Sequence, residues 1–278
     1  MNRHISSMEL AALILSAVFV FPFRAGKAEN SFDYANYVAV LKTYVVDGFV
    51  KYKDLKVDRK KLDAFINQLG SLDRRTYESW SEKDKIAFWI NAYNGITLQA
   101  VIDNYPIKSG FVGSWLYPKN SIRQISGVWD KQTHRVMGEK ITLNHIEHET
   151  LRKKFNEPRI HMALNCASIG CPALRNEPFE GGKLGKQLDD QSRSFLKLSR
   201  NYRLKGKTLT LSSILSWFGT DFVKSYGSGS QFSGFNETER AVLNFIIRHL
   251  DEDQKKKLTS TSFSIEFLKY DWALNDKS

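Results

Sequence analysis

The stretch SEKDKIAFWINAYNGITLQAVIDNYP, residues 81–106, contains the longest helical pattern of the chain. Ser81 is a typical N-cap, and Asp84, three residues later, is its partner in a capping box. Large side chains then recur at helical spacing, at Ile86, Trp89, Ile90, Tyr93, Thr97, Val101 and Ile102. Pro106 ends the pattern, because proline cannot continue a helix. We therefore expect one long helix over residues 81–105.

Helical patterns also dominate the chain on both sides of this stretch. They predict further helices over residues 31–46, 55–69, 145–155, 184–198, 213–226 and 237–250. Turn signals at Gly138 and Gly206 predict two hairpins, and residues 262–268 alternate as a strand does. Because the strands occur as hairpins and not as βαβ units, the sequence predicts an α+β fold: a mainly helical single domain with a small antiparallel sheet of hairpins.

Residues 1–28 have the three parts of a secretory signal peptide. A basic start is followed by an apolar run, and Gly26 and Ala28 are small residues before a cleavage point. The apolar run is shorter than the about 20 residues that span a membrane, although two basic residues after it are compatible with an uncleaved anchor. We expect one globular domain over residues 29–278 and a periplasmic or secreted protein without a membrane span after cleavage.

The chain is basic, with a formal net charge of +11. Nucleic-acid-binding proteins typically carry a stripe of basic residues interleaved with aromatic residues. The lysines and arginines of this chain are scattered and form no such stripe. We therefore predict no nucleic-acid partner. The partner is unknown, and a basic surface suits a peptide or an anionic polymer of the cell envelope.

The stretch HMALNCASIGCP, residues 161–172, holds both cysteines of the chain. Cys166 lies five positions after His161, and Cys171 lies ten positions after it. The alternation of apolar residues over 160–164 predicts a short extended segment that leads Cys166 into a turn. Two cysteines five apart in an oxidising compartment are compatible with one small disulfide loop. The reactive side chains of the sequence are therefore concentrated here.

Four interpretations of these residues stay open. Export favours a structural disulfide between Cys166 and Cys171. Alternatively, Cys166 is a nucleophile whose thiolate forms with the help of His161 or His148; in a straight strand His161 points away from Cys166, which makes His148 an equal candidate. The four side chains also suit zinc, but their spacing does not, so we predict no metal and no cofactor. A redox-active disulfide is the fourth interpretation.

Other polar residues are candidates for the same site. Asn91 and Asn94 share one helical face, where they either orient a catalytic group or pair with buried backbone of residues 107–133. Arg152 and Arg175 flank the cysteine segment and are candidates to bind a substrate carboxylate, although solvated surface charge is the simpler interpretation.

Four stretches occur in order along the chain: KIAFWINAYN at 85–94, IEH at 146–148 with Leu151 and Arg152, the segment 158–174, and YDWALN at 270–275. Together they resemble the domain of unknown function 547 family, with a family core over about residues 80–200. The resemblance implies that eight residues occupy characteristic positions of that family: Asn91, Asn94, His148, Arg152, His161, Cys166, Cys171 and Pro172. It implies no activity, because the family has no assigned function.

The combination of Asn, His and Cys is similar to that of papain-like and transglutaminase-like enzymes, although those place the cysteine before the histidine. Our first hypothesis is a thiol hydrolase or acyl transferase that acts on peptide or amide bonds. Cys166 would be the nucleophile, His161 or His148 the base, and Asn91 or Asn94 the orienting group. The alternative is a non-enzymatic binding or scaffold domain of the periplasm, stapled by the disulfide.

Overall fold

The computed structural model describes residues 32–109, 113–229 and 231–277. The signal peptide predicted over residues 1–28 lies outside the described residues. Within the described ranges, no helix is both long enough and apolar enough to cross a membrane.

The long helix predicted from the sequence is α5, Glu82–Asn104, and it is buried along most of its length. The Ser81 hydroxyl accepts a hydrogen bond from the Asp84 backbone N–H at 3.2 Å, as the capping motif predicts. Helices α2 (Tyr52–Val57) and α3 (Lys60–Ser71) pack against α5, and α1 (Ala35–Tyr44) packs against α2 and α3. Together these helices bury the first of two hydrophobic cores. The single helix expected over residues 55–69 is therefore two helices, because the backbone at Asp58 leaves the helical conformation.

Short elements complete this first body. They are β1 (Val45–Val46), β2 (Phe49–Val50), α4 (Arg74–Glu78), α6 (Gly113–Leu116), η1 (Ile122–Gln124), β3 (His134–Val136), β4 (Glu139–Ile141), the π-helix η2 (His145–Arg152), η3 (Pro158–Met162) and η4 (Gly181–Lys183). β1 with β2 and β3 with β4 form two separate antiparallel hairpins, the second at the predicted position.

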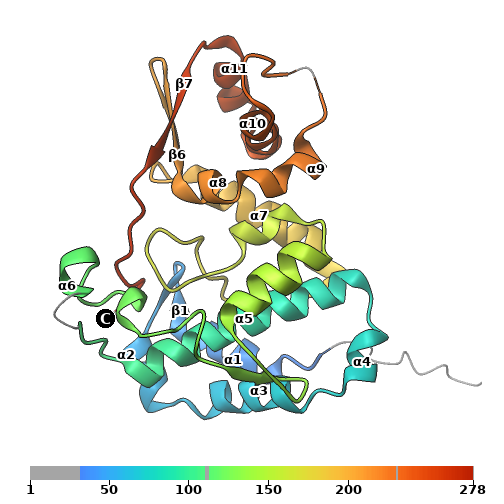
Figure 1. Ribbon diagram of the computed structural model, residues 1–278, viewed down its shortest axis with the longest axis vertical. Helices are drawn as coiled ribbons and strands as arrows, with labels where there is room; N and C mark the ends of the chain where they lie inside the picture. Colours follow the sequence, from blue (N-terminus) through green and yellow to red (C-terminus); the bar gives the residue numbers. More distant parts are fainter. Residues whose placement is uncertain (1–31, 110–112, 230, 278) are drawn as a thin grey trace, which may run out of the picture.

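A second hydrophobic core lies in the upper body of Figure 1. It is enclosed by β5 (Tyr202–Lys205), β6 (Thr208–Ser212), α8 (Ser213–Trp217), η5 (Gly219–Phe222), α9 (Val223–Tyr226), α10 (Glu237–His249), α11 (Glu252–Ser260) and β7 (Ser264–Leu268). β5 and β6 form the second predicted hairpin, but β7 pairs with β6 in parallel. The mainly helical α+β class is confirmed, whereas the hairpins do not join one antiparallel sheet.

Two segments connect the bodies. Helix α7 (Leu184–Lys197) lies between them in Figure 1 and contacts α5, η3 and α10. The tail that follows β7 returns to the first body, where its backbone hydrogen-bonds to two segments at once: residues 167–170 and β2. The tail therefore lies where the two bodies meet, next to the cysteine segment.

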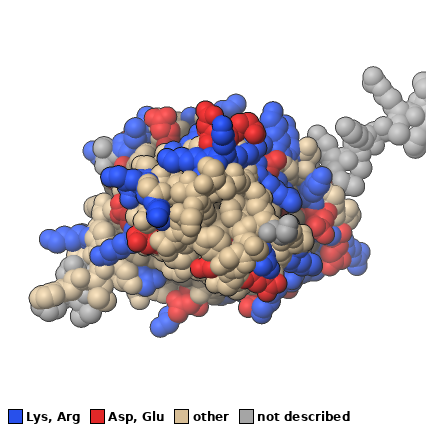
Figure 2. Space-filling model, turned by 90° about the horizontal axis from the view of Figure 1, so that it is seen from above, with Lys and Arg blue, Asp and Glu red and all other residues tan. Residues whose placement is uncertain are grey.

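The surface carries both signs of charge. On the face that Figure 2 shows, basic and acidic side chains lie intermixed around a broad area that carries neither. This face presents no continuous basic stripe.

Gly95 generates a prediction about the first core. A Cβ added there would lie 2.4 Å from the ring of Phe65, which is itself stacked on Tyr37 at 4.3 Å between ring centroids. Because neither ring has space to move, we expect Gly95→Ala to lower the free energy of unfolding by about 1–3 kcal/mol in urea denaturation.

Gly185 in α7 is the matched control, because nothing lies within 4 Å of a Cβ added there. Gly185→Ala should raise the free energy of unfolding by about 0.5–1 kcal/mol, through the higher helix propensity of alanine. Equal effects of the two substitutions would contradict the packing described for α5.

Candidate functional site

A pocket of about 350 Å³ opens between the two bodies, a volume within the usual range of small-molecule sites. Its walls come from α5, η2, η3, α8, the cysteine segment and the tail. The lining residues are Tyr93, Arg123, Trp129, Asn144, Glu147, His148, His161, Leu164, Cys166, Cys171, Pro172, Ile214, Trp217, Phe218, Tyr270 and Trp272. Aromatic rings make up much of this lining, so the pocket combines a large apolar surface with a few polar groups.

Helix α5 positions the cysteine segment through one buried amide. The Asn94 side chain donates to the Ala163 carbonyl at 3.0 Å and accepts from the Asn165 N–H at 2.8 Å. These two bonds use the amide on both its donor and its acceptor side. Asn94 therefore fixes the backbone immediately before Cys166.

The Asn91 side chain likewise pairs with the backbone of a second segment. Its amide donates to the Phe179 carbonyl at 2.8 Å and accepts from the Phe179 N–H at 2.9 Å. Neither Asn91 nor Asn94 lines the pocket, and both amides pair with backbone within residues 163–179 and not with residues 107–133. An orienting role for either amide stays a prediction.

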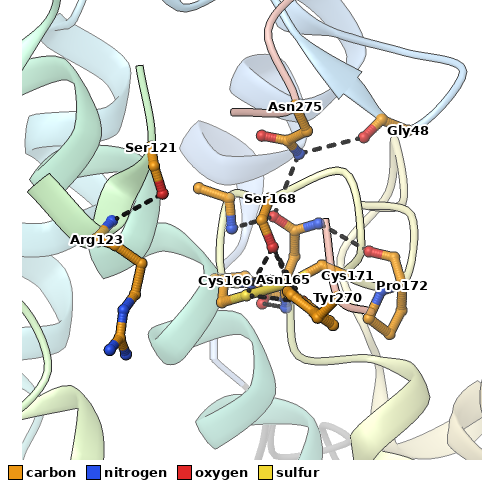
Figure 3. The surroundings of a disulfide bond; sticks show 12 residues. Gly48, Ser121, Arg123, Asn165, Cys166, Ser168, Cys171, Pro172, Tyr270 and Asn275 are labelled. Carbon is orange, nitrogen blue, oxygen red and sulfur yellow. Dashed lines mark hydrogen bonds between the residues drawn. A yellow bond between two sulfur atoms is a disulfide. The ribbon is translucent and has the colours of Figure 1, made fainter. Parts of the chain in front are cut away.

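The cysteines form a disulfide whose Cα atoms lie 6.1 Å apart. The Cys166 N–H donates to Cys171 Sγ at 2.9 Å, and the Tyr270 hydroxyl lies 3.1 Å from Cys171 Sγ and 3.3 Å from Cys166 Sγ. Figure 3 shows Tyr270 beside both sulfur atoms. Tyr270 from the tail thus covers the disulfide, and both cysteines and Tyr270 line the pocket.

The loop around the disulfide is held by a buried asparagine. Asn165 donates to the Pro172 carbonyl at 2.7 Å and accepts from the Ala167 N–H at 2.9 Å (Figure 3). Asn275 from the tail adds a bond to the same Asn165 oxygen at 3.4 Å. The loop is therefore closed twice, once by the disulfide and once by an amide.

His161 is buried and its partner is a residue that the sequence did not single out. Its Nε2 lies 2.8 Å from Asp221 Oδ2, and its ring stacks on Phe218 at 4.0 Å between centroids. Burial lowers the pKa of His161, so we assign a neutral imidazole that donates Nε2–H to the Asp221 carboxylate. Its unprotonated nitrogen is then Nδ1.

Arg152 completes this network. It donates to both oxygens of Asp221, at 2.6 and 2.8 Å, and its third contact is His148 Nδ1 at 2.9 Å. Burial opposes the charge of Asp221, but the hydrogen bonds from Arg152 and His161 hold its pKa well below the usual range. Since a guanidinium only donates, His148 accepts at Nδ1 and carries its proton on Nε2. Burial is the main cause that lowers the pKa of His148, and the positive charge of Arg152 lowers it further.

Glu147 is a further titratable group of the pocket and lies on η2 beside His148. Its carboxyl hydrogen-bonds with the buried Tyr93 hydroxyl, which also bonds to Trp129. Burial raises the pKa of Glu147 to about 7, although the Tyr93 bond and Arg152 lower it. A carboxyl that titrates near neutrality inside a pocket is typical of functional sites, and so is a π-helical turn.

The structure brings together some of the predicted residues. Cys166, Cys171, His148 and His161 all line the pocket, with Pro172 beside them. The extended segment expected over residues 160–164 is wrong: η3 is a 3₁₀ helix that begins at Pro158, where Glu157 accepts from the Arg159 N–H. His161 therefore does not lie on a straight strand that would point it away from Cys166.

The two arginines predicted to bind substrate are already paired within the protein. Arg152 is bound by Asp221, and Arg175 by Glu177, with Gln191 at 3.4 Å. Neither of them lines the pocket. The pocket's own arginine is Arg123, which sequence reasoning passed over.

Sequence reasoning also missed most of the aromatic wall. Its members come from residues 107–133, α8 and the tail: Trp129, Trp217, Phe218, Tyr270 and Trp272. The signal was present, because both the irregular stretch 107–133 and the tail are unusually aromatic for segments without predicted helices. Asp221 carried no such signal, since isolated acidic residues are common on surfaces, whereas Glu147 lies inside the IEH stretch at 146–148.

The zinc interpretation gains no support. In the described part of the chain, no group of three or more His, Cys, Asp or Glu side chains is arranged to hold a metal ion. His161 and His148 instead use their ring nitrogens in bonds to Asp221 and Arg152.

Glu147→Gln tests the electrostatics of the pocket. The folded-state pKa of Glu147 is raised to about 7, above the ordinary 4.5. Ionisation therefore opposes folding as pH rises from about 4 to 7, and the stability that depends on the protonated form is lost across that window. We expect Glu147→Gln to be stabilising by roughly 1–3 kcal/mol above pH 7 and nearly neutral at pH 4, in urea denaturation across pH.

Glu149, two residues further on, provides the control. It is exposed, and a hydrogen bond from Lys153 lowers its pKa. Glu149→Gln should therefore show no stabilisation that grows with pH. A gain from Glu147→Gln that is the same at pH 4 and pH 8 would refute the raised pKa.

Comparison with known families places this site partly inside a matched segment. Residues 77–196 match the family model described as "Protein of unknown function, DUF547". The matched segment includes α5, Arg123, η2 and the disulfide, whereas α8, Asp221 and the tail lie beyond it. Searches of curated proteins and of solved structures found no match.

Proposed function

Residues 77–196 belong to the DUF547 family, whose function is unknown, and we propose that this chain is an envelope protein that binds a small organic ligand in the pocket between its two bodies. The proposal places the protein in the periplasm or outside the cell. Support for that location comes from the signal-like pattern of residues 1–28 and from the disulfide, which persists in oxidising compartments.

The observation that carries this proposal is the composition of the pocket wall. Rings from sequence-distant segments meet there, with Trp217 stacked on Trp272 at 6.2 Å and Tyr270 packed on Trp272 at 4.6 Å between centroids. Among the residues that line the pocket there is no Ser, Thr or Lys, and its two cysteines are bonded to each other. An apolar pocket with few polar groups and no free thiol favours binding over covalent catalysis.

Fluorescence of N-phenyl-1-naphthylamine (NPN), a neutral aromatic probe, tests the proposal. We expect NPN to bind with increased fluorescence, and Trp217→Ala to raise its Kd about threefold to tenfold through the lost ring contact. Trp217 is half exposed, so its removal leaves the two cores intact.

Trp115→Ala is the matched control, because Trp115 is 82% exposed and does not line the pocket. It should leave the Kd of NPN unchanged. Absence of NPN binding, or an equal effect of the two tryptophan variants, would reject the pocket as a ligand site.

A second candidate function is a thiol hydrolase or acyl transferase acting on peptide or amide bonds. One observation favours it: Cys166 and His161 line the same pocket, and Asp221 orients the imidazole. This is the combination of thiol, base and orienting carboxylate that cysteine enzymes use. The reaction requires a free thiol, so it would proceed only after reduction of Cys166–Cys171.

Thiol labelling distinguishes the two functions. For protein purified from the periplasm and treated with iodoacetamide, the binding proposal predicts no adduct by intact mass before reduction and two adducts after reduction and unfolding. The thiol-enzyme candidate requires that the periplasm keeps the pair reduced, so it predicts labelling of Cys166 without added reductant, formed more slowly in His161→Ala. One adduct formed before reduction would therefore exclude a permanent disulfide between Cys166 and Cys171.

A further inference from the structure

Arg123 occupies an unusual position at the pocket. Its guanidinium lies over three rings, with 4.5 Å to the centroid of Tyr117, 5.0 Å to Trp272 and 5.6 Å to Trp129. It also donates to the Tyr117 hydroxyl. Its backbone N–H donates to the Ser121 hydroxyl at 3.1 Å, and the side chain extends away from that bond in Figure 3. The rings thus hold the cation in one place without neutralising it.

This guanidinium has no acidic partner in the part of the chain that the structure describes, where no carboxylate lies within 4 Å of it. Four partly buried arginines of the described residues do pair with carboxylates, namely Arg59, Arg152, Arg159 and Arg175, whereas the partly buried Arg240 bonds to the Gly227 carbonyl. An arginine that is fixed by rings, exposed to solvent and free of a carboxylate presents most of its donors outward.

The other titratable groups of the lining do not cancel this charge. Burial lowers the pKa values of His148 and His161, so both are neutral near pH 7. Burial raises the pKa of Glu147 to about 7, so near that pH a substantial share of this carboxyl is protonated. Arg123 is then the permanent charge of the pocket lining, and protonated Glu147 is a hydrogen-bond donor.

We infer that the ligand is a small organic anion: Arg123 binds its carboxylate or a similar oxyanion, and the rings of Trp129, Trp217 and Trp272 contact its apolar body. This inference rests on the proposed ligand-binding function and adds the chemical class of the ligand. A guanidinium matches a carboxylate in a two-bond geometry, which gives charge recognition at the mouth of an otherwise apolar site.

Two probes that differ by one charged group test this inference. 8-Anilino-1-naphthalenesulfonate (ANS) has the ring framework of NPN with a sulfonate added. We expect Arg123→Met to raise the Kd of ANS about tenfold, the effect of losing one charge-assisted hydrogen bond, and to change the Kd of NPN less than twofold. Arg75→Met removes the same charge from an exposed site outside the pocket and should change neither Kd.

The outcomes separate the inference from the proposed function. If Arg123→Met weakens ANS and NPN equally, or weakens neither, the anion inference is wrong while NPN binding still supports a ligand pocket. If Arg75→Met weakens ANS as much as Arg123→Met, the effect is one of net charge and the inference also fails. If neither probe binds the unmodified protein, the proposed function itself fails.

Discussion

Two buried amides on one helix determine where the rest of the site lies. Asn94 and Asn91 each bind backbone on both their donor and acceptor sides, one before Cys166 and the other at Phe179. Because α5 is buried, water cannot replace these bonds, and an unpaired amide or carbonyl there would cost about 1–3 kcal/mol each. The segment between the two contact points includes the disulfide loop. Its position therefore follows from the register of a single helix.

The charged side chains near the pocket are likewise held by shared partners. Asp221 accepts from Arg152 and His161 together, which joins the second body to η2 and η3 of the first. Arg152 in turn fixes the tautomer of His148. Most charged groups near the pocket are therefore paired with other groups of the protein, and two are exceptions. They are Arg123, held by three rings and a bond to the Tyr117 hydroxyl, and Glu147, whose burial favours the neutral acid.

The sequence predicted local structure well where a single side chain controls it. The cap at Ser81 and the hairpin at Gly206 confirm the expected elements, because each depends on residues a few positions apart. The prediction failed at residues 160–164, where apolar alternation suggested an extended segment but Pro158 and the Glu157 side chain start the 3₁₀ helix η3.

The candidate site was only partly predictable for a related reason. Its cysteines and histidines are adjacent in sequence, so their grouping was visible. The Asp221 partner of His161 lies 60 positions away, and Tyr270 lies 104 positions from Cys166. No periodic pattern encodes contacts of that separation. The parallel pairing of β7 with β6 was hidden in the same way.

The tail after β7 has a consequence for the order in which the protein is completed. Tyr270 and Trp272 line the pocket, and backbone bonds from Asp271, Ala273 and Asn275 tie the tail to residues 167–170 and to β2. These residues leave the ribosome after every other part of the pocket wall. The last part of the pocket wall to be synthesised is therefore the part that covers the disulfide, and the wall is complete only once this tail has docked.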